Sequence, residues 1–131
     1  MPRNNYNQKF KKGERLKLRK RIDFLFRRGT ALNEFPVQVV YVIDDSPDAA
    51  EMQVAFSVSK KLFKNAVDRN RIKRLLREAY RKQSYEMKKL VHQKNAAVYV
   101  MLIYKSNKEL PYEEIAEKIF LLLQRLKKTI E

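Results

Sequence analysis

The residues that decide the fold of this chain are 57–81, SVSKKLFKNAVDRNRIKRLLREAYR. From residue 66 onward, side chains suited to a protein core recur at spacings of three and four residues, which is the period of a helix with one buried face. We therefore expect a long helix from about Ala66 to about Leu90. Its core face carries Ile72, Leu75, Leu76, Ala79, Tyr80, Gln83 and Met87.

The opposite side of this predicted helix is cationic. At about 100° per residue, the side chains that fan across it are Asn70, Lys73, Arg74, Arg77 and Arg81. Arginine presents a planar fork that meets phosphate oxygens in pairs, so an arginine-rich face favours a phosphate-bearing partner. The alternative is a solvated charged face, which is how many such runs end up.

Composition points to the same kind of partner. The 131 residues include 30 Lys and Arg against 15 Asp and Glu, which gives a formal net charge of +15. A charge of this size attracts polyanions, and nucleic acid is the leading partner. No run approaches the roughly 20 apolar residues of a spanning helix, and no signal-peptide pattern is present, so we expect a cytoplasmic protein without a membrane partner.

The rest of the sequence is compatible with one α+β domain. Residues 1–13 are polar and basic with no apolar period, and we expect a flexible arm followed by a single RNA-binding domain, residues 14–131. A first helix is predicted over Arg15–Arg28, with Gly29 as its stop. Residues 37–43 and 52–58 alternate in polarity and predict two strands that pair antiparallel.

Two further elements follow the long helix. The nearly continuous apolar run Ala96–Tyr104 predicts a strand in the middle of the sheet, because such a strand is covered on both faces. A last helix is predicted from about Pro111. Its buried stripe consists of Ile115, Ile119, Leu122, Leu123, Leu126 and Ile130.

No motif predicts catalysis by the protein itself, and no residue is assigned a catalytic role. The single histidine, His92, belongs to no triad-like or paired-histidine arrangement. Asp44, Asp45 and Asp48 surround a Ser-Pro pair, as in a surface turn, and a divalent-metal cluster is the less favoured alternative. The chain has only two glycines and no cysteine, so it lacks a glycine-rich phosphate loop and thiolate metal ligands.

A second candidate surface lies at the end of the first helix. Phe24 and Phe26 stand beside two arginines, and one face of the predicted strands carries small or polar residues such as Ala55 and Ser57. Single-stranded bases stack on aromatic surfaces of this kind, so a trough for single-stranded RNA is one interpretation. Packing of both phenylalanines in the core is the other.

The motif Ser57–Lys61, followed by Asn65–Val67 and Arg69–Glu78, resembles the signature of the bacterial ribonuclease P protein subunit. The resemblance extends upstream to the Phe26–Gly29 helix end and downstream to the last helix. In that family the RNA subunit is the catalyst and holds the Mg²⁺ ions, while the protein binds that RNA and the 5′ leader of precursor tRNA. The resemblance thus implies a monomer within a ribonucleoprotein.

The same resemblance implies a fold and two sets of contacts. The fold is an α/β sandwich of the ribosomal-protein-like type, with a mostly antiparallel sheet, the order α-β-β-(β)-α-β-α and a left-handed βαβ crossover, against the general preference for right-handed ones. The implied contacts to the RNA subunit are Lys60, Lys61, Arg69, Asn70, Arg71, Lys73, Arg74 and Arg77. The implied leader-binding cleft consists of Ile22, Phe26, Val40, Tyr41, Ala55 and Ser57.

These observations lead to one predicted function and two alternatives. The prediction is an accessory subunit of a ribozyme that removes the 5′ leader from precursor tRNA. A ribosomal-protein-like structural RNA-binding module explains the charge equally well, but not the motif of residues 57–78. A protein-only metallonuclease that uses Asp44, Asp45 or Asp48 is the least favoured.

Overall fold

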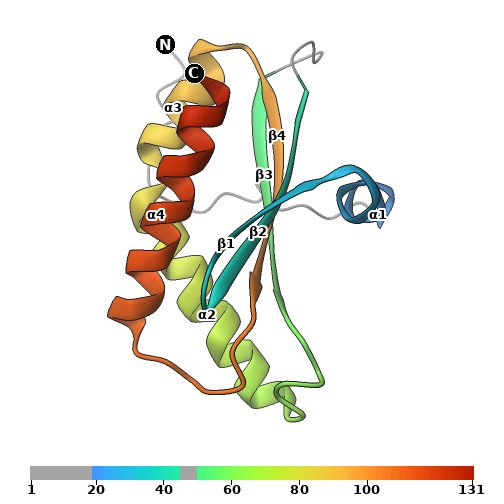
Figure 1. Ribbon diagram of the computed structural model, residues 1–131, viewed down its shortest axis with the longest axis vertical. Coiled ribbons are helices and arrows are strands. Elements are labelled where there is room, and N and C mark those ends of the chain that lie inside the picture. Colours follow the sequence, from blue (N-terminus) through green and yellow to red (C-terminus); the bar gives the residue numbers. More distant parts are fainter. Residues whose placement is uncertain (1–18, 45–49) are drawn as a thin grey trace.

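The computed structural model describes residues 19–44 and 50–131, which form a four-stranded sheet with helices on both faces (Figure 1). The predicted arm therefore lies outside the described residues, as do the start of the first helix, Asp45 and Asp48. Helices α2, α3 and α4 cover one face of the sheet, and α1 crosses the other. The elements in chain order are α1 (Arg19–Arg28), β1 (Thr30–Glu34), β2 (Val37–Asp44), β3 (Glu51–Val58), α2 (Ala66–Gln83), α3 (Tyr85–Gln93), β4 (Ala97–Tyr104) and α4 (Tyr112–Ile130).

Strand β4 lies inside the sheet, as predicted. The strand order is β1-β2-β4-β3, with β4 antiparallel to β2 and parallel to β3. The predicted antiparallel pairing of β2 with β3 is therefore wrong: Met101 of β4 stands between Val40 and Ala55. The reason is burial, since β4 is apolar on both faces and loses most of its contact with water in an interior position.

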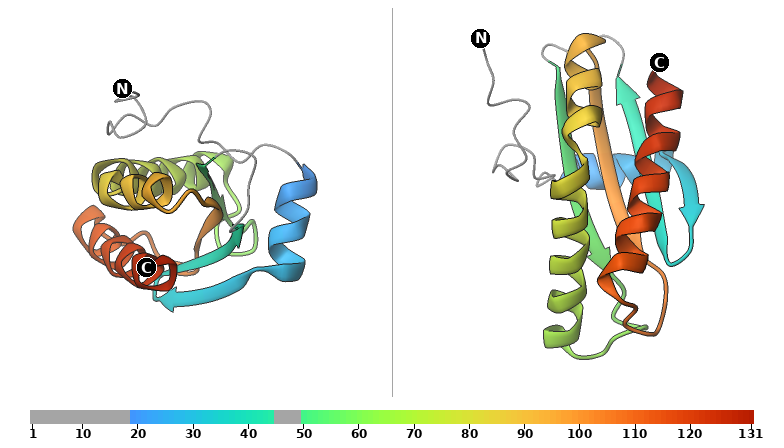
Figure 2. Two further views of the ribbon diagram at one scale, coloured as in Figure 1. Left: turned by 90° about the horizontal axis from the view of Figure 1, so that it is seen from above. Right: turned by 90° about the vertical axis from the view of Figure 1, so that its left-hand side faces the viewer.

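The connection from β3 to β4 joins two parallel neighbours through α2 and α3. In the right-hand view of Figure 2 these helices lie in front of the sheet, both strands run downward, and β4 lies to the right of β3. This arrangement is a left-handed crossover, as the resemblance implied.

The crossover contains two helices rather than the predicted single one. The helix breaks at Ser84, which is fully buried, and whose hydroxyl lies 3.4 Å from the carbonyl oxygen of Arg81. A serine hydroxyl can compete for backbone carbonyls and so interrupt a helix. The buried stripe continues past the break through Met87 and Val91, so the apolar period alone did not reveal it.

Strand β1 was not predicted from the sequence; it precedes the two predicted strands, whereas the implied order placed its optional strand after them. It pairs antiparallel with β2, and only Leu32 and Glu34 of its five residues are even partly buried. A strand so exposed carries little of the polarity alternation on which strand prediction depends. The hairpin with β2 therefore did not stand out in the sequence.

Two apolar clusters hold the layers together. The larger lies between the sheet and the helices α2–α4, and it contains the predicted core residues Ile72, Leu76, Ala79 and Tyr80 together with most of the predicted stripe of α4. The smaller lies under α1 and consists of Leu25, Val40, Met101 and Ile103. No helix within the described residues is long and apolar enough to cross a membrane.

Candidate nucleic-acid interface

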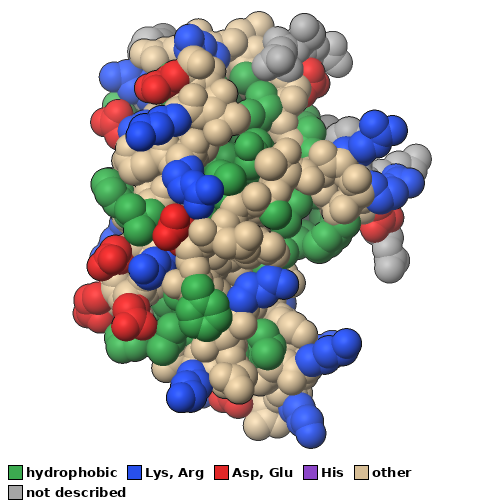
Figure 3. Space-filling model, viewed as in Figure 1, with side chains coloured by type: hydrophobic (Ala, Val, Ile, Leu, Met, Phe, Trp, Pro, Cys, Tyr) green, Lys and Arg blue, Asp and Glu red, His purple; other side chains and the backbone are tan. Residues whose placement is uncertain are grey.

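Helix α2 has the two faces that its sequence predicts. Ile72 and Leu76 are completely buried, whereas Asn70 and Arg74 are exposed on the opposite side. Lys73 and Arg77 are partly exposed next to them. Figure 3 shows Lys and Arg side chains around the lower end of the molecule, where α2 begins. Asn70, Lys73, Arg74 and Arg77 thus form one surface, called here the outer face of α2.

Arg69 occupies a different position from this outer face. One terminal nitrogen of its guanidinium donates hydrogen bonds of 2.8 Å to the carbonyl oxygens of both Phe63 and Lys64. These carbonyls belong to the loop between β3 and α2, which also carries the predicted contacts Lys60 and Lys61, both exposed. Arg69 therefore fixes the loop in which those lysines lie.

Arg71 also departs from the outer face. Its guanidinium forms an ion pair of 2.8 Å with Glu109, in the loop between β4 and α4, and a longer one of 3.4 Å with Asp68. Since both acids are partly exposed, each pair is weak, but together they offset the charge of Arg71. The structure thus separates Arg71 from Arg74, although the family resemblance implies an RNA contact for both.

Arg77 lies beside the sheet. Its guanidinium carbon lies 5.5 Å from the centroid of the Phe56 ring, within the range of a cation–π contact. Nothing in the sequence pattern singles out Phe56 as a neighbour of Arg77, because the two residues are 21 positions apart in the chain. Only the packing of α2 on β3 brings them together.

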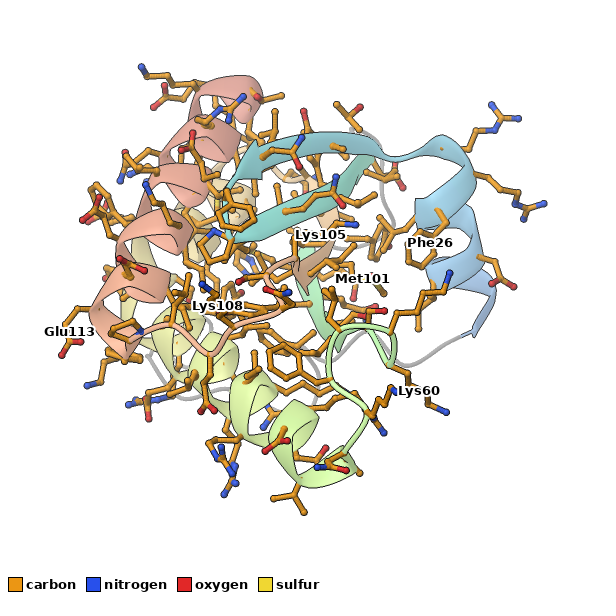
Figure 4. All side chains as sticks on the ribbon, turned by 60° about the horizontal axis from the view of Figure 1, so that its bottom comes forward. Phe26, Lys60, Met101, Lys105, Lys108 and Glu113 are labelled. Atoms are coloured by element: carbon orange, nitrogen blue, oxygen red, sulfur yellow. The ribbon has the colours of Figure 1, made fainter. Side chains whose placement is uncertain are left out.

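The second predicted surface lies on the opposite face of the sheet. In Figure 4, Phe26 extends from α1 on the side of the sheet where Met101 lies. Its side chain is 59% exposed, whereas Ile22 is partly buried against the small cluster under α1. Val40 and Ala55 flank Met101 on the neighbouring strands, and the register places Ser57 beside Ile103 in the next row.

Tyr41 does not belong to this surface, which corrects the prediction for that residue. Successive side chains of a strand point to opposite faces, so Tyr41 points away from α1 when its neighbour Val40 points toward it. Tyr41 is buried in the large cluster beneath α2–α4. Only Val40 of this predicted pair faces α1, and it is itself mostly covered.

Sequence patterns alone missed one cation of this face. Lys105 is exposed directly after β4, and the alternation of that strand continues the row of Met101 and Ile103 into it. Its backbone N–H donates a 2.7 Å hydrogen bond to the carbonyl oxygen of Pro36, so its position is fixed. In Figure 4 Lys105 and Lys60 lie on the same side as Phe26. Continuing the alternation of β4 one residue past the end of the strand would have placed Lys105 on this face.

Two of the three aspartates of the metallonuclease alternative, Asp45 and Asp48, lie outside the described residues, so that alternative stays untested. Within residues 19–44 and 50–131, no three His, Cys, Asp or Glu side chains are grouped so that they could hold a metal ion. Asp44 is exposed at the end of β2. Partial burial lowers the pKa of His92, which lies in α3, at the opposite end of the helical layer from the start of α2 (Figure 1).

Comparison with known proteins gives consistent matches. The family described as Ribonuclease P matches residues 10–127. The "Ribonuclease P protein component" of Porphyromonas gingivalis is 38% identical over 100 residues, covering 76% of this chain and 72% of that protein. The protein of the same name from Bacillus pumilus is 33% identical over 109 residues, covering 83% and 84%.

Solved structures of two bacterial proteins share the fold of this chain. The RNase P protein of Staphylococcus aureus superimposes with a TM-score of 0.64 at 23% identity, covering 92% of this chain and all of that one. The RNase P protein from Thermotoga maritima gives a TM-score of 0.63 at 24% identity, covering 86% and 96%.

Proposed function

Because this chain belongs to the ribonuclease P protein family, we propose that it is the protein subunit of that ribonucleoprotein and assists a catalytic RNA in removing the 5′ leader from precursor tRNA. The observation that carries the proposal is the outer face of α2, which holds cationic side chains toward solvent on a helix whose other side is fixed in the core. Matches over most of the chain favour this role over that of a ribosomal-protein-like module.

Phosphate contacts are the proposed task of the outer face. Structured RNA has a deep, narrow major groove, so proteins meet it chiefly through its backbone and 2′-hydroxyls. Arg74 and Arg77 supply forked donors, Lys73 supplies a point charge, and Asn70 supplies both a donor and an acceptor. Lys60 and Lys61 extend the basic surface along the loop that Arg69 holds.

The precursor leader is assigned to the face that carries α1. Its exposed aromatic ring, Phe26, offers a stacking surface for a single-stranded base, and the small side chains of Ala55 and Ser57 are partly exposed on β3. Lys105, which is exposed at the end of β4, adds positive charge for the backbone of the leader. The RNA subunit and the leader would therefore occupy opposite sides of β3.

Hydrolysis is assigned to the RNA and not to the protein. Mg²⁺ is expected to be held chiefly by RNA phosphates, and the described residues offer the ion no cluster of acidic side chains. The protein contributes positive charge that lowers the repulsion between two polyanions. It is proposed to act in the cytoplasm as a single copy within the ribonucleoprotein.

Reconstitution tests the proposal. The purified protein alone should cleave nothing, and with its cognate RNA subunit it should increase cleavage of leader-bearing precursor tRNA at modest Mg²⁺. Precursor tRNA without a leader serves as the control for leader binding. No gain on reconstitution, or co-purification mainly with ribosomal RNA, would instead support a structural RNA-binding module.

A further inference from the structure

We propose that Phe56 of β3 is a positioning residue for Arg77, holding its guanidinium where α2 meets an RNA phosphate. The inference rests on the proposed function of α2 and adds a strand residue to that surface. Its basis is the 5.5 Å separation between the guanidinium carbon of Arg77 and the centroid of the Phe56 ring. At this distance the negative face of an aromatic ring attracts a guanidinium.

Phe56 is itself held in place by the core. Its ring meets that of Tyr80 edge-on, with centroids 6.1 Å apart and planes at 67°, which is a favoured geometry for aromatic pairs. Tyr80 is almost fully buried and lies on α2 one turn beyond Arg77. Phe56 is thus held in place by Tyr80 of α2 and in turn orients Arg77 of the same helix.

Arg77 is held differently from other arginines of the same helix. Arg69 donates to backbone carbonyls, and Arg71 and Arg81 pair with carboxylates, so their donors already have oxygen partners. Within the described residues, the buried Nε of Arg77 has no hydrogen-bond acceptor. Contact with a ring orients the guanidinium without neutralising its charge, which leaves that charge for an anion.

Orientation in advance matters because a free arginine is flexible. Immobilising such a side chain on binding costs conformational entropy, and a ring that already restricts it reduces this cost. The contact should therefore contribute to RNA affinity even though Phe56 does not touch the RNA. A similar aliphatic side chain would fill the same space without attracting the guanidinium.

A double-mutant cycle on the full chain tests the inference, with binding to the cognate RNA subunit measured by titration. Phe56→Leu should weaken binding about threefold to tenfold, while Phe56→Tyr, which keeps the ring, should stay within about twofold of wild type. In an Arg77→Ala background, Phe56→Leu should cause no further loss. Phe120→Leu, at an exposed site on α4, is the matched control and should leave binding unchanged.

Melting temperatures of all variants separate positioning from packing. Phe56→Leu should lower stability in both backgrounds through lost packing, and slightly more when Arg77 is present, whereas its effect on RNA binding should disappear in the Arg77→Ala background. An equal loss of binding in both backgrounds, or no loss in either, would overturn the inference. Failure of the wild-type protein to bind the RNA subunit would instead refute the proposed function.

Discussion

The guanidinium of Arg71 on α2 lies 2.8 Å from the carboxylate of Glu109, which is 38 residues further along the chain. This pair separates Arg71 from the outer face of α2, where Arg74 is exposed. The two arginines, which the family resemblance assigns the same RNA contact, therefore differ in how much charge they present to an RNA. Substitutions at these positions should differ accordingly in their effects.

Arg74→Ala should weaken binding to the RNA subunit more than Arg71→Ala does. Removing one phosphate contact should lower the salt slope of binding by roughly 0.7–0.9, and the charge of Arg71 is already offset by Glu109. Titrations at several salt concentrations measure both slopes. Glu109→Gln should raise the affinity for the RNA subunit modestly, since it removes the carboxylate that pairs with Arg71. Equal losses of binding in Arg74→Ala and Arg71→Ala would contradict the predicted order of the two variants.

Arg69→Ala should loosen the loop before α2. Removing the guanidinium leaves the carbonyls of Phe63 and Lys64 without the donor that ties them to the helix. Amide hydrogen exchange should increase in residues 60–65, and RNA binding should fall through Lys60 and Lys61. Arg74→Ala is the control, because it removes the same charge without a bond to this loop. Unchanged exchange in Arg69→Ala would count against the role.

Ile72→Asp should unfold the domain, since Ile72 is completely buried and an unpaired carboxylate there costs more than about 4 kcal/mol. Lys73→Asp, one residue along the helix, should leave the fold intact while weakening RNA binding. Circular dichroism and thermal melting distinguish the two variants. A folded Ile72→Asp protein would mean that the core face of α2 is misplaced.

Gly29→Ala should destabilise the docking of α1. A Cβ at this position would lie 2.6 Å from Cγ1 of Val40 and would also meet the carbonyl oxygen of Leu25, to which the Gly29 N–H donates. Overpacking of this kind typically costs about 1–3 kcal/mol. Thr30→Ala, at an exposed neighbouring site, should change stability far less in the same denaturant titration.

Tyr104→Phe should destabilise the loop after β4 by about 1–2 kcal/mol. The hydroxyl donates a 2.7 Å hydrogen bond to the carbonyl oxygen of Lys108 and accepts one of 3.0 Å from the N–H of Leu110. The same loop carries Glu109, so its ion pair with Arg71 should also weaken. Thermal melting of the variant measures the loss of stability, and its RNA affinity reports the weakening of the Arg71–Glu109 ion pair.

Stability at alkaline pH provides a second test of Tyr104. Burial raises the pKa of its hydroxyl above the ordinary value of about 10, so the folded state favours the neutral form. The resulting stabilisation is fully present below about pH 10 and is lost as the pH rises through the raised pKa. Tyr104→Phe should therefore show a shallower alkaline decline than wild type, not a flat one, because burial also raises the pKa of Tyr112.

Strong local patterns made much of the architecture predictable. The apolar period of α4 and the continuous run of β4 each identified one element, and burial agrees with both. The pairing of β2 with β3 was predicted wrongly because proximity in sequence favoured a hairpin, whereas the sheet places its most apolar strand between them. Partner choice depends on the total burial of the sheet, which no single segment encodes.

The candidate site was likewise predictable only in part from the sequence. The two faces of α2, one in the core and one cationic, were predictable from the sequence alone, because both follow from the helical period of Ile72, Leu76 and Arg74. Three contacts became known only from the folded chain: Arg69 holds a loop, Arg71 pairs with Glu109, and Arg77 contacts the ring of Phe56. The contacts of Arg71 and Arg77 depend on residues from other elements, Glu109 in the loop between β4 and α4 and Phe56 on β3. Distances between different elements are set by packing rather than by the spacing of residues along one element.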